Sequence, residues 1–282
     1  MDVMPRAPKL ETLSPPRLWP PAPMTRKHIV ALILLAAVVA AFATGSFAQA
    51  TQPHKSTVIE ALLRWAPLLL KGFVFNLFIS AGAMLAGTLL GVFVGIGQMS
   101  RVALIRIPAK IVTEVFRNSP WLVVLFACIL LLPFQIRIFG LVIPFPDWAK
   151  AIFGFSIPVM ANTSEIVRGA VMSVPTGQWE SAESLGYSRA QSYLHIILPQ
   201  CVRRMLPPWM NLYSLVTMAT VYSALVGVSE MLTLTSEALA AEGSRPDFLA
   251  PFYAFVLVCF FVYCYPIGKW TQYLERKYQV KV

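Results

Sequence analysis

The chain has 282 residues, of which 57% are hydrophobic and only 13% are charged. Soluble globular domains carry about 25% charged residues, so this composition excludes a soluble enzyme or binding module and indicates an integral membrane protein. The formal net charge of +10 does not require a nucleic-acid partner, because basic residues collect on the cytoplasmic loops of membrane proteins.

Cysteine and histidine show no pattern of a metal site or a disulfide framework. The four cysteines form no C-x-x-C pair, and three of them lie in apolar runs, where cysteine behaves as a small hydrophobic residue. The three histidines are scattered along the chain. We therefore expect no bound metal.

The N-terminal part, residues 1–28, is rich in proline and is expected to be a disordered cytoplasmic tail. An apolar run at 29–48 follows, which predicts an extra N-terminal transmembrane helix or signal anchor. Alternatively, Arg26-Lys27 before the run and Ala48-Gln49-Ala50 after it fit a cleaved signal peptide. Both interpretations place Thr51 outside the cell.

Five further segments are apolar enough to cross about 30 Å of hydrocarbon, which takes about 20 helical residues. In chain order they are 72–99, 118–136 (with the helix expected to begin near Lys110), 151–172, 205–229 and 248–268. The sequence therefore predicts an all-α, polytopic bundle of membrane helices.

The distribution of lysine and arginine predicts the orientation of this bundle. With the N-terminus inside, the cytoplasmic segments hold fifteen basic residues and the opposite segments hold six. Because basic residues favour the cytoplasmic side, we expect both termini to lie in the cytoplasm.

A polar segment, residues 176–199, interrupts the apolar chain between two of the predicted spans. Thr176 is expected to be the N-cap of a short helix, with Glu180 near its positive end. This helix is expected to stop at Gly186, since glycine best tolerates the left-handed conformation that follows a helix.

A second short helix is expected to complete this cytoplasmic segment, which we call the elbow. Ser188 and Gln191 have the spacing of a capping box. Pro199 is expected to end the helix, because the residue before a proline avoids the α conformation. Helical spacing places four residues on one apolar face, expected to pack on the bundle: Ala190, Tyr193, Leu194 and Ile197.

The elbow also carries a recognisable signature. Its residues resemble the EAA-x3-G-x9-I-x-LP pattern of permease subunits of bacterial ABC importers, with Ser181 in place of the first alanine. The matching positions are Glu180, Ser181, Ala182, Gly186, Ile196, Leu198 and Pro199.

Three more stretches are similar to the polar amino-acid uptake branch, the histidine/glutamine/arginine permease type. They are "EVFRNSPWLVVLF", "TSEIVRGAVMSVPTGQWESAESLGYS" and "GVSEML". The resemblance covers residues 65–275. It implies five core transmembrane helices of the type I ABC importer permease fold, in the bacterial inner membrane, with the elbow as the ATPase-coupling site.

The resemblance also implies partners. These are a dimer of ATP-binding subunits, a second permease (identical or paralogous) and an extracytoplasmic solute-binding protein. The chain has no G-x-x-x-x-G-K-[ST] motif, so it lacks a phosphate-binding loop of its own. We expect it to bind no cofactor and to be no enzyme, while the partner ATPase uses ATP and Mg.

Two pairs of charges fall inside or next to predicted spans: Glu114 with Arg117, and Glu165 with Arg168. A separation of three places each pair on one helix face. A charge at membrane depth is costly unless it is paired or hydrated, and often marks a functional site. These residues either contact the solute and the pore, or lock helices together.

Two departures from the branch bear on the solute. Residues 218–220 read Met-Ala-Thr where the branch usually reads Lys-Asp-Thr, and Asn118-Ser119 replaces Gly-Thr. The changes favour a divergent solute, such as an opine, a modified amino acid or another zwitterion. The alternative function is an ion-coupled secondary carrier, which would predict inverted repeats. The sequence shows no convincing repeat, and no motif of a membrane-embedded enzyme.

Overall fold

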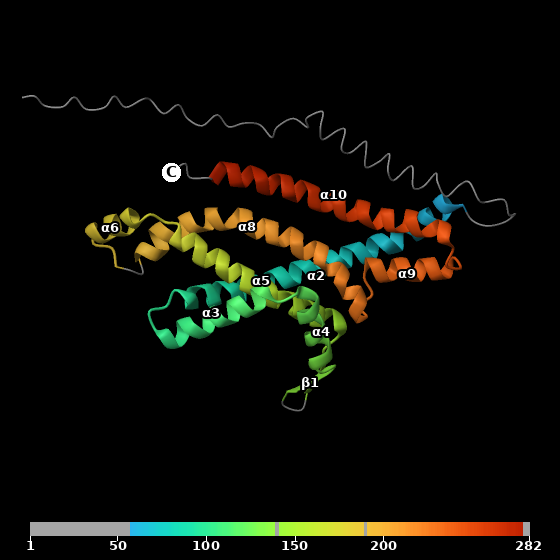
Figure 1. Ribbon diagram of the computed structural model, residues 1–282, viewed down its shortest axis with the longest axis horizontal. Helices are drawn as coiled ribbons and strands as arrows, with labels where there is room; N and C mark the ends of the chain where they lie inside the picture. The colour runs from blue at the N-terminus through green and yellow to red at the C-terminus, as the bar shows by residue number, and fades with distance from the viewer. Residues whose placement is uncertain (1–56, 139–140, 189–190, 279–282) are drawn as a thin grey trace, which may run out of the picture.

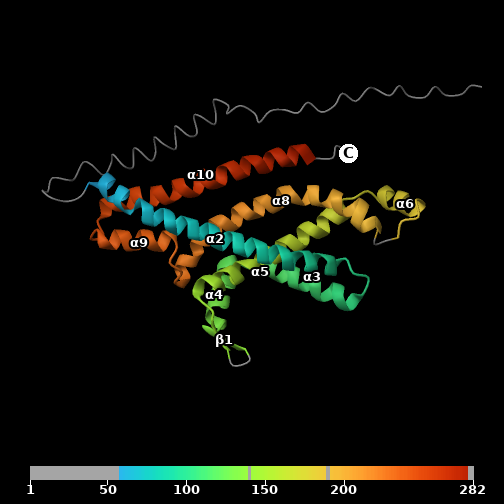
Figure 2. The same ribbon diagram turned by 180° about the vertical axis from the view of Figure 1, so that it is seen from behind.

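The computed structural model describes residues 57–138, 141–188 and 191–278, so the N-terminal tail and the predicted helix 29–48 lie outside the described residues. Most helices run along one long axis, with α6 at one end and α9 at the other (Figures 1 and 2). The elements in chain order are α2 (Val58–Gln98), α3 (Ala103–Asn118), α4 (Trp121–Leu131), β1 (Gln135–Ile138), β2 (Leu141–Pro144), α5 (Asp147–Met172), α6 (Thr176–Ser184), the π-helix η2 (Ser192–Ile197), α8 (Leu198–Ala219), the 3-10 helix η3 (Thr220–Val226), α9 (Met231–Ala241) and α10 (Pro246–Tyr278).

Two helices, α2 and α10, are each long and apolar enough to cross a membrane. Two bent pairs also qualify if each pair is one span: α3 with α4, bent by 107°, and the helix Ser192–Val226 with α9, bent by 50°. The remaining core helix, α5, has 26 residues and includes the charges of Asp147, Lys150, Glu165 and Arg168. The helical membrane bundle is thus confirmed, with two candidate spans among the described residues, or up to four if each bent pair is one span.

The prediction of one continuous helix from about Lys110 to Ile136 is wrong. The helix breaks at Ser119, which has an extended backbone (φ −80°, ψ 140°) and precedes the N-cap Pro120 of α4, as expected for a residue before proline. The Ser119 hydroxyl and the Asn118 amide donate to the Val115 and Glu114 carbonyls at the end of α3. A small antiparallel hairpin of β1 and β2 follows α4.

The most extensive contact between two helices of the described bundle is that of α2 with α5. Glycines at 87, 91 and 95 lie one turn apart on the face of α2 that meets α5, and a Cβ added at any of them would come within 2.8 Å of α5. Small residues at such spacing let two membrane helices pack closely. The glycine pattern therefore positions α5, which carries Glu165 and Arg168.

A buried polar cluster fixes α3 against the same two helices. Gln98 Nε2 of α2 donates to Thr113 Oγ1 of α3 at 2.9 Å and to Ser164 Oγ of α5 at 3.1 Å. The two hydroxyl oxygens are 2.8 Å apart. Because buried polar groups must be paired, this cluster favours one register of α3, and Arg117 follows on the next turn.

On the other side of the bundle, α8 packs between α5 and α10. Leu212 and Val216 of α8 are buried in the main hydrophobic core with Phe155 of α5. Tyr213 and Tyr263 join α8 to α10 through their hydroxyl groups, which are 2.7 Å apart. The elbow is therefore attached to the bundle by α5 on one side and α8 on the other (Figure 1).

Candidate functional site

The first half of the elbow is the short helix α6. Its N-cap is Pro175, without a side-chain hydrogen bond, so the prediction that Thr176 caps it is wrong. The end of the helix follows the prediction. Gly186 has φ +76°, and Gly186 N and Tyr187 N donate to the Glu183 and Ala182 carbonyls, which is a Schellman motif.

The second half of the elbow begins with the predicted capping box. Ser188 N donates to Gln191 Oε1 at 2.9 Å, and Gln191 N donates to Ser188 Oγ at 3.4 Å. The helix that follows does not end at Pro199, so that prediction is wrong. It runs through η2 directly into α8, which begins at Leu198 and carries Pro199 at its start.

The two halves of the elbow pack against each other. Ala182 is 1% exposed, and the Trp179 ring meets Tyr193 edge-on with centroids 4.8 Å apart. Ile197 lies in a small core with Val174 of the α5–α6 connection. Ala182 is thus part of the contact between the two halves of the elbow, and its role in ATPase coupling stays a prediction.

The outer surface of the elbow is mixed apolar and polar. Leu185 is 74% exposed and Leu194 61% exposed, so the prediction that Leu194 packs on the bundle is also wrong. The wider turn of η2 buries Ser192 and Ile197, five residues apart, instead. Of the predicted coupling residues, Glu180, Ser181, Gly186, Leu198 and Pro199 are exposed, Ile196 is partly buried and Ala182 is buried.

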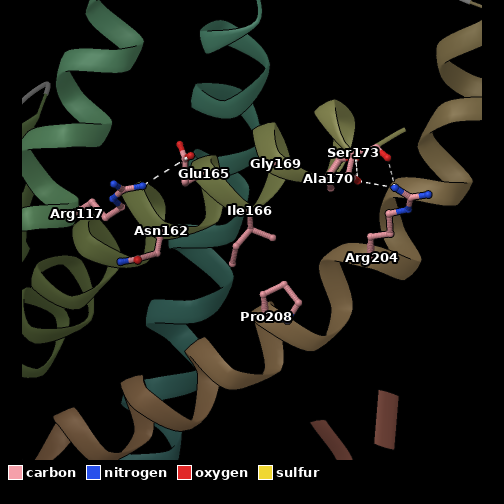
Figure 3. A pocket seen from close by; sticks show the side chains of 9 residues that line it. All are labelled: Arg117, Asn162, Glu165, Ile166, Gly169, Ala170, Ser173, Arg204 and Pro208. Atoms are coloured by element: carbon pink, nitrogen blue, oxygen red, sulfur yellow. Dashed lines mark hydrogen bonds and ion pairs between the residues drawn. The ribbon is translucent and has the colours of Figure 1, made fainter. Parts of the chain in front are cut away.

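A cleft of about 410 Å³ lies between α3, α5 and α8, and contains predicted pore residues (Figure 3). Arg117 Nη1 of α3 is 3.7 Å from Glu165 Oε1 of α5. Glu165 also accepts from Arg168 Nε at 3.1 Å. The structure thus joins Arg117, Glu165 and Arg168 in one cluster.

Glu114 does not belong to this cluster. It is exposed and makes no ion pair among the described residues. The shared face of Glu114 and Arg117 on α3 therefore does not make them an ion pair, and Arg117 instead makes the cross-helix contact that the helix-locking alternative predicts. Arg117 pairs across to α5 because the packing of α3 on α5 brings Glu165 within its reach.

The opposite end of the cleft is closed by Arg204 of α8 (Figure 3). Its Nη1 donates to the carbonyl oxygen of Ser173 and, at 2.7 Å, to Ser173 Oγ. Ser173 is the C-cap of α5. Arg204 thus ties the end of α5 to the start of α8, at the base of the elbow.

A buried network near the other end of the bundle was not predicted. Asn76 Nδ2 donates to Glu230 Oε2 at 2.8 Å and to Thr220 Oγ1 at 3.0 Å. Glu230 is fully buried and caps α9 by accepting from the backbone N–H groups of the next turn. The "GVSEML" stretch of the sequence contains Glu230. Its partner Asn76 lies 154 residues earlier, so the sequence alone does not indicate their contact.

Comparison with known proteins connects this geometry to a family. The family described as "Binding-protein-dependent transport system inner membrane component" matches residues 87–280. Among solved structures, an amino acid ABC transporter with histidines aligns at a TM-score of 0.66 with 24% identity, over 77% of this chain and 96% of that one. The MetNI methionine ABC transporter in an inward-facing conformation aligns at 0.60 with 18% identity, over 77% and 98%.

Proteins that are similar in sequence are also named as transport permeases. The probable amino-acid ABC transporter permease protein YckA of Bacillus subtilis is 36% identical over 212 residues, which are 75% of this chain and 89% of that one. The L-cystine transport system permease protein TcyB of the same organism is 27% identical (75% and 86%). The octopine permease protein OccM of Rhizobium radiobacter is 26% identical (77% and 88%). The chain belongs to the family of inner membrane components of binding-protein-dependent transport systems, as an ABC importer permease and not an ion-coupled secondary carrier.

Proposed function

We propose that this permease forms half of the pore of an ATP-driven importer, and that the solute is a polar amino acid or a related zwitterion. The elbow is the observation that carries the proposal. It is a capped two-part unit at the end of the bundle, joined to both α5 and α8, and its exposed Leu185 and Leu194 offer apolar contacts to a partner.

Two observations support the choice of solute. Relatives carry names that refer to amino acids, cystine and octopine. The charged cleft of this chain holds a carboxylate, Glu165, beside the guanidinium of Arg117. Such a pair can exchange its internal contact for the ammonium and carboxylate groups of a zwitterion.

The importer requires further subunits. We propose a second permease, identical or paralogous, a dimer of ATP-binding subunits that holds the ATP and Mg, and an extracytoplasmic solute-binding protein. Family membership supports the separate ATPase and the binding protein. The chain has no phosphate-binding loop motif, so we assign it no ATP site and no cofactor.

The proposed orientation places the elbow in the cytoplasm and both termini inside. The asymmetry of fifteen basic residues to six supports it. The ATPase then meets the elbow, and the binding protein meets the end of the bundle that contains α9.

Reconstitution tests this function. The permease, co-expressed with its ATPase and binding-protein partners, is expected to take up an amino acid into vesicles only with ATP on the elbow side and binding protein on the other. A cysteine at Ser188, labelled by an impermeant reagent, reports the side of the elbow. Uptake that needs an ion gradient but no ATP would contradict the proposal, and uptake with ATP on the side opposite Ser188 would contradict the orientation.

The ion pair in the cleft supplies a second prediction. We expect Glu165→Gln to reduce uptake at least about tenfold and to leave assembly intact, because a partly exposed ion pair stabilises by only about 0–1 kcal/mol. Transport and co-purification with the ATPase are measured on the same preparation. Glu114→Gln, on the neighbouring exposed position, is the control and should transport normally. Loss of assembly by Glu165→Gln would assign the pair to helix locking instead.

A further inference from the structure

The long helix that leaves the elbow, Ser192–Val226, bends by 50° where it is followed by α9. Gly227, directly after this helix, has φ +86° and open space around it. Glycine has the fewest backbone restrictions of all residues. The chain at Gly227 therefore does not by itself fix the angle between the two helices.

Asn76 of α2 links the two sides of this bend. Its Nδ2 donates to Thr220 Oγ1, before the bend, at 3.0 Å and to Glu230 Oε2, after the bend, at 2.8 Å. Its Oδ1 accepts from the backbone N–H of Met231, the first residue of α9, at 3.1 Å. Asn76, Thr220 and Glu230 are fully buried, and we call these three residues the Asn76–Glu230 network.

The polar atoms of both central side chains have partners. Glu230 Oε1 accepts from Leu232 N at 2.9 Å and from Thr233 N at 3.1 Å, while its Oε2 accepts from Asn76. Both ends of the Asn76 amide are used as well. A satisfied buried network favours one arrangement over others that leave a donor or acceptor unpaired, so this network holds the bend at one angle.

Close packing of α2 on α9 strengthens this arrangement. Gly72 lies one turn before Asn76, which places both residues on one face of α2. A Cβ at Gly72 would be 2.8 Å from Met231 Cα, so α2 meets the backbone of α9 directly, and the two helices lie side by side (Figures 1 and 2). This part of α2, η3 and the start of α9 therefore form one rigid block.

We propose that the Asn76–Glu230 network transmits motion between α9 and the elbow, so that docking of the loaded binding protein at the α9 end stimulates the ATPase at the elbow. The inference rests on the proposed function, which places these partners at the two ends. Thr220 belongs to the helix that continues into the elbow, and Glu230 caps α9. Without the network, a shift of α9 is taken up by rotation at Gly227 and does not reach the elbow. Asn76 and Glu230 are thus positioning residues, which act through the two helices.

Spin labels test whether the network holds the bend. In the assembled complex, the four native cysteines are replaced by alanine, and labels are attached to cysteines at Ser236 of α9 and Leu215 of α8, both exposed. If the second permease is identical, excess unlabelled chain leaves one labelled copy in each complex. Pulsed electron paramagnetic resonance then measures the distribution of distances between the two labels.

Glu230→Gln is expected to widen this distribution at least about twofold, because the new amide places an N–H group against an N–H donor whichever way it turns. Both carboxyl oxygens of Glu230 accept hydrogen bonds, so neither end of the new amide avoids this conflict. A distribution of unchanged width would overturn the proposal.

A reciprocal exchange should restore the pairing. Asn76→Asp alone places two carboxyl groups side by side. In the double variant Asn76→Asp/Glu230→Gln, the new amide donates to the new carboxyl group, which still accepts from Met231 N and can accept from the Thr220 hydroxyl. We expect this variant to remove at least about half of the widening seen in either single variant, as coupling between contacting residues predicts. A double variant as wide as the single variants would contradict the proposed pairing.

The functional measurement is the ATPase activity of the same complex in vesicles, with and without loaded binding protein. Glu230→Gln is expected to lower the stimulation at least about fivefold, since a buried unpaired donor destabilises the arrangement that transmits it. Basal activity, co-purification of the ATPase and affinity for the binding protein should be unchanged, and the double variant should regain stimulation. Ser214→Ala is the control and should keep full stimulation, because the buried Ser214 hydroxyl on the same long helix has no hydrogen-bond partner among the described residues.

The outcomes separate this inference from the proposed function. Full stimulation in Glu230→Gln, or a loss of stimulation that follows a parallel loss of binding-protein affinity, would overturn the transmission role. A wild-type complex that binding protein does not stimulate would contradict the proposed function and the transmission with it. The distance distributions would still show whether the network holds the bend.

Discussion

Replacing Gly91 with leucine is expected to leave almost no folded permease in the membrane. A Cβ at this position would lie 2.6 Å from Thr163 Cβ and 2.7 Å from the Met160 carbonyl oxygen, and the backbone of α5 cannot move aside without disturbing the buried Ser164 cluster. Gly91→Ala, a milder form of the same change, is expected to cost about 1–3 kcal/mol, as overpacking does in other cores. Thermal unfolding in detergent, followed by size-exclusion chromatography, measures both.

The same helix provides a matched control. A Cβ at Gly97 would meet its nearest neighbour, Ala109 Cβ, at 3.4 Å, which is an ordinary contact. Gly97→Ala should therefore leave stability unchanged or raise it, since alanine favours a helix over glycine by about 1 kcal/mol. If Gly91→Ala proved no less stable than Gly97→Ala, the close approach of α2 and α5 would not contribute to the fold as we describe.

Substitution of Gly186 by valine is expected to uncouple ATP hydrolysis from transport. Gly186 has φ +76° and open space around its Cα, so the obstacle to a side chain is the backbone conformation alone, which costs a β-branched residue about 1 kcal/mol or more. Relief of that strain would change the angle between α6 and the capping box. The bundle lies elsewhere, so insertion should be normal.

The measurement compares co-purification of the ATPase with stimulation of its activity by loaded binding protein. Gly186→Asn is the control, since asparagine tolerates the left-handed conformation, and it should retain most of the coupling. Glu180→Lys, which reverses an exposed charge on α6, should weaken association instead. Normal coupling in both Gly186→Val and Glu180→Lys would mean that the elbow is only a connecting loop.

The parts of the elbow that could be predicted are those encoded by neighbouring residues. The turn at Gly186 and the capping box of Ser188 and Gln191 depend on residues within one helical turn of each other, and both are present. The break at Ser119-Pro120 had the same kind of local signal. It was missed because apolar residues on both sides suggested one continuous span.

Other features depend on contacts between distant parts of the chain. The burial of Ala182 requires the return of η2 onto α6. The choice of Glu165 over Glu114 as the partner of Arg117 depends on the packing of α3 on α5. Helical spacing also assumed an α-helix after Ser188, whereas the π-helix η2 turns more slowly per residue and exposes Leu194.

The second half of the elbow is continuous with a long helix that runs from Ser192 to Val226. These residues form one helical unit before the bend at Gly227, with a length of about 50 Å by the rises of its segments. If a helix of this length tilts by about 5° about one end, its other end moves by about 4 Å. A push on the elbow would therefore also move the other end of this helix, next to the bend at Gly227.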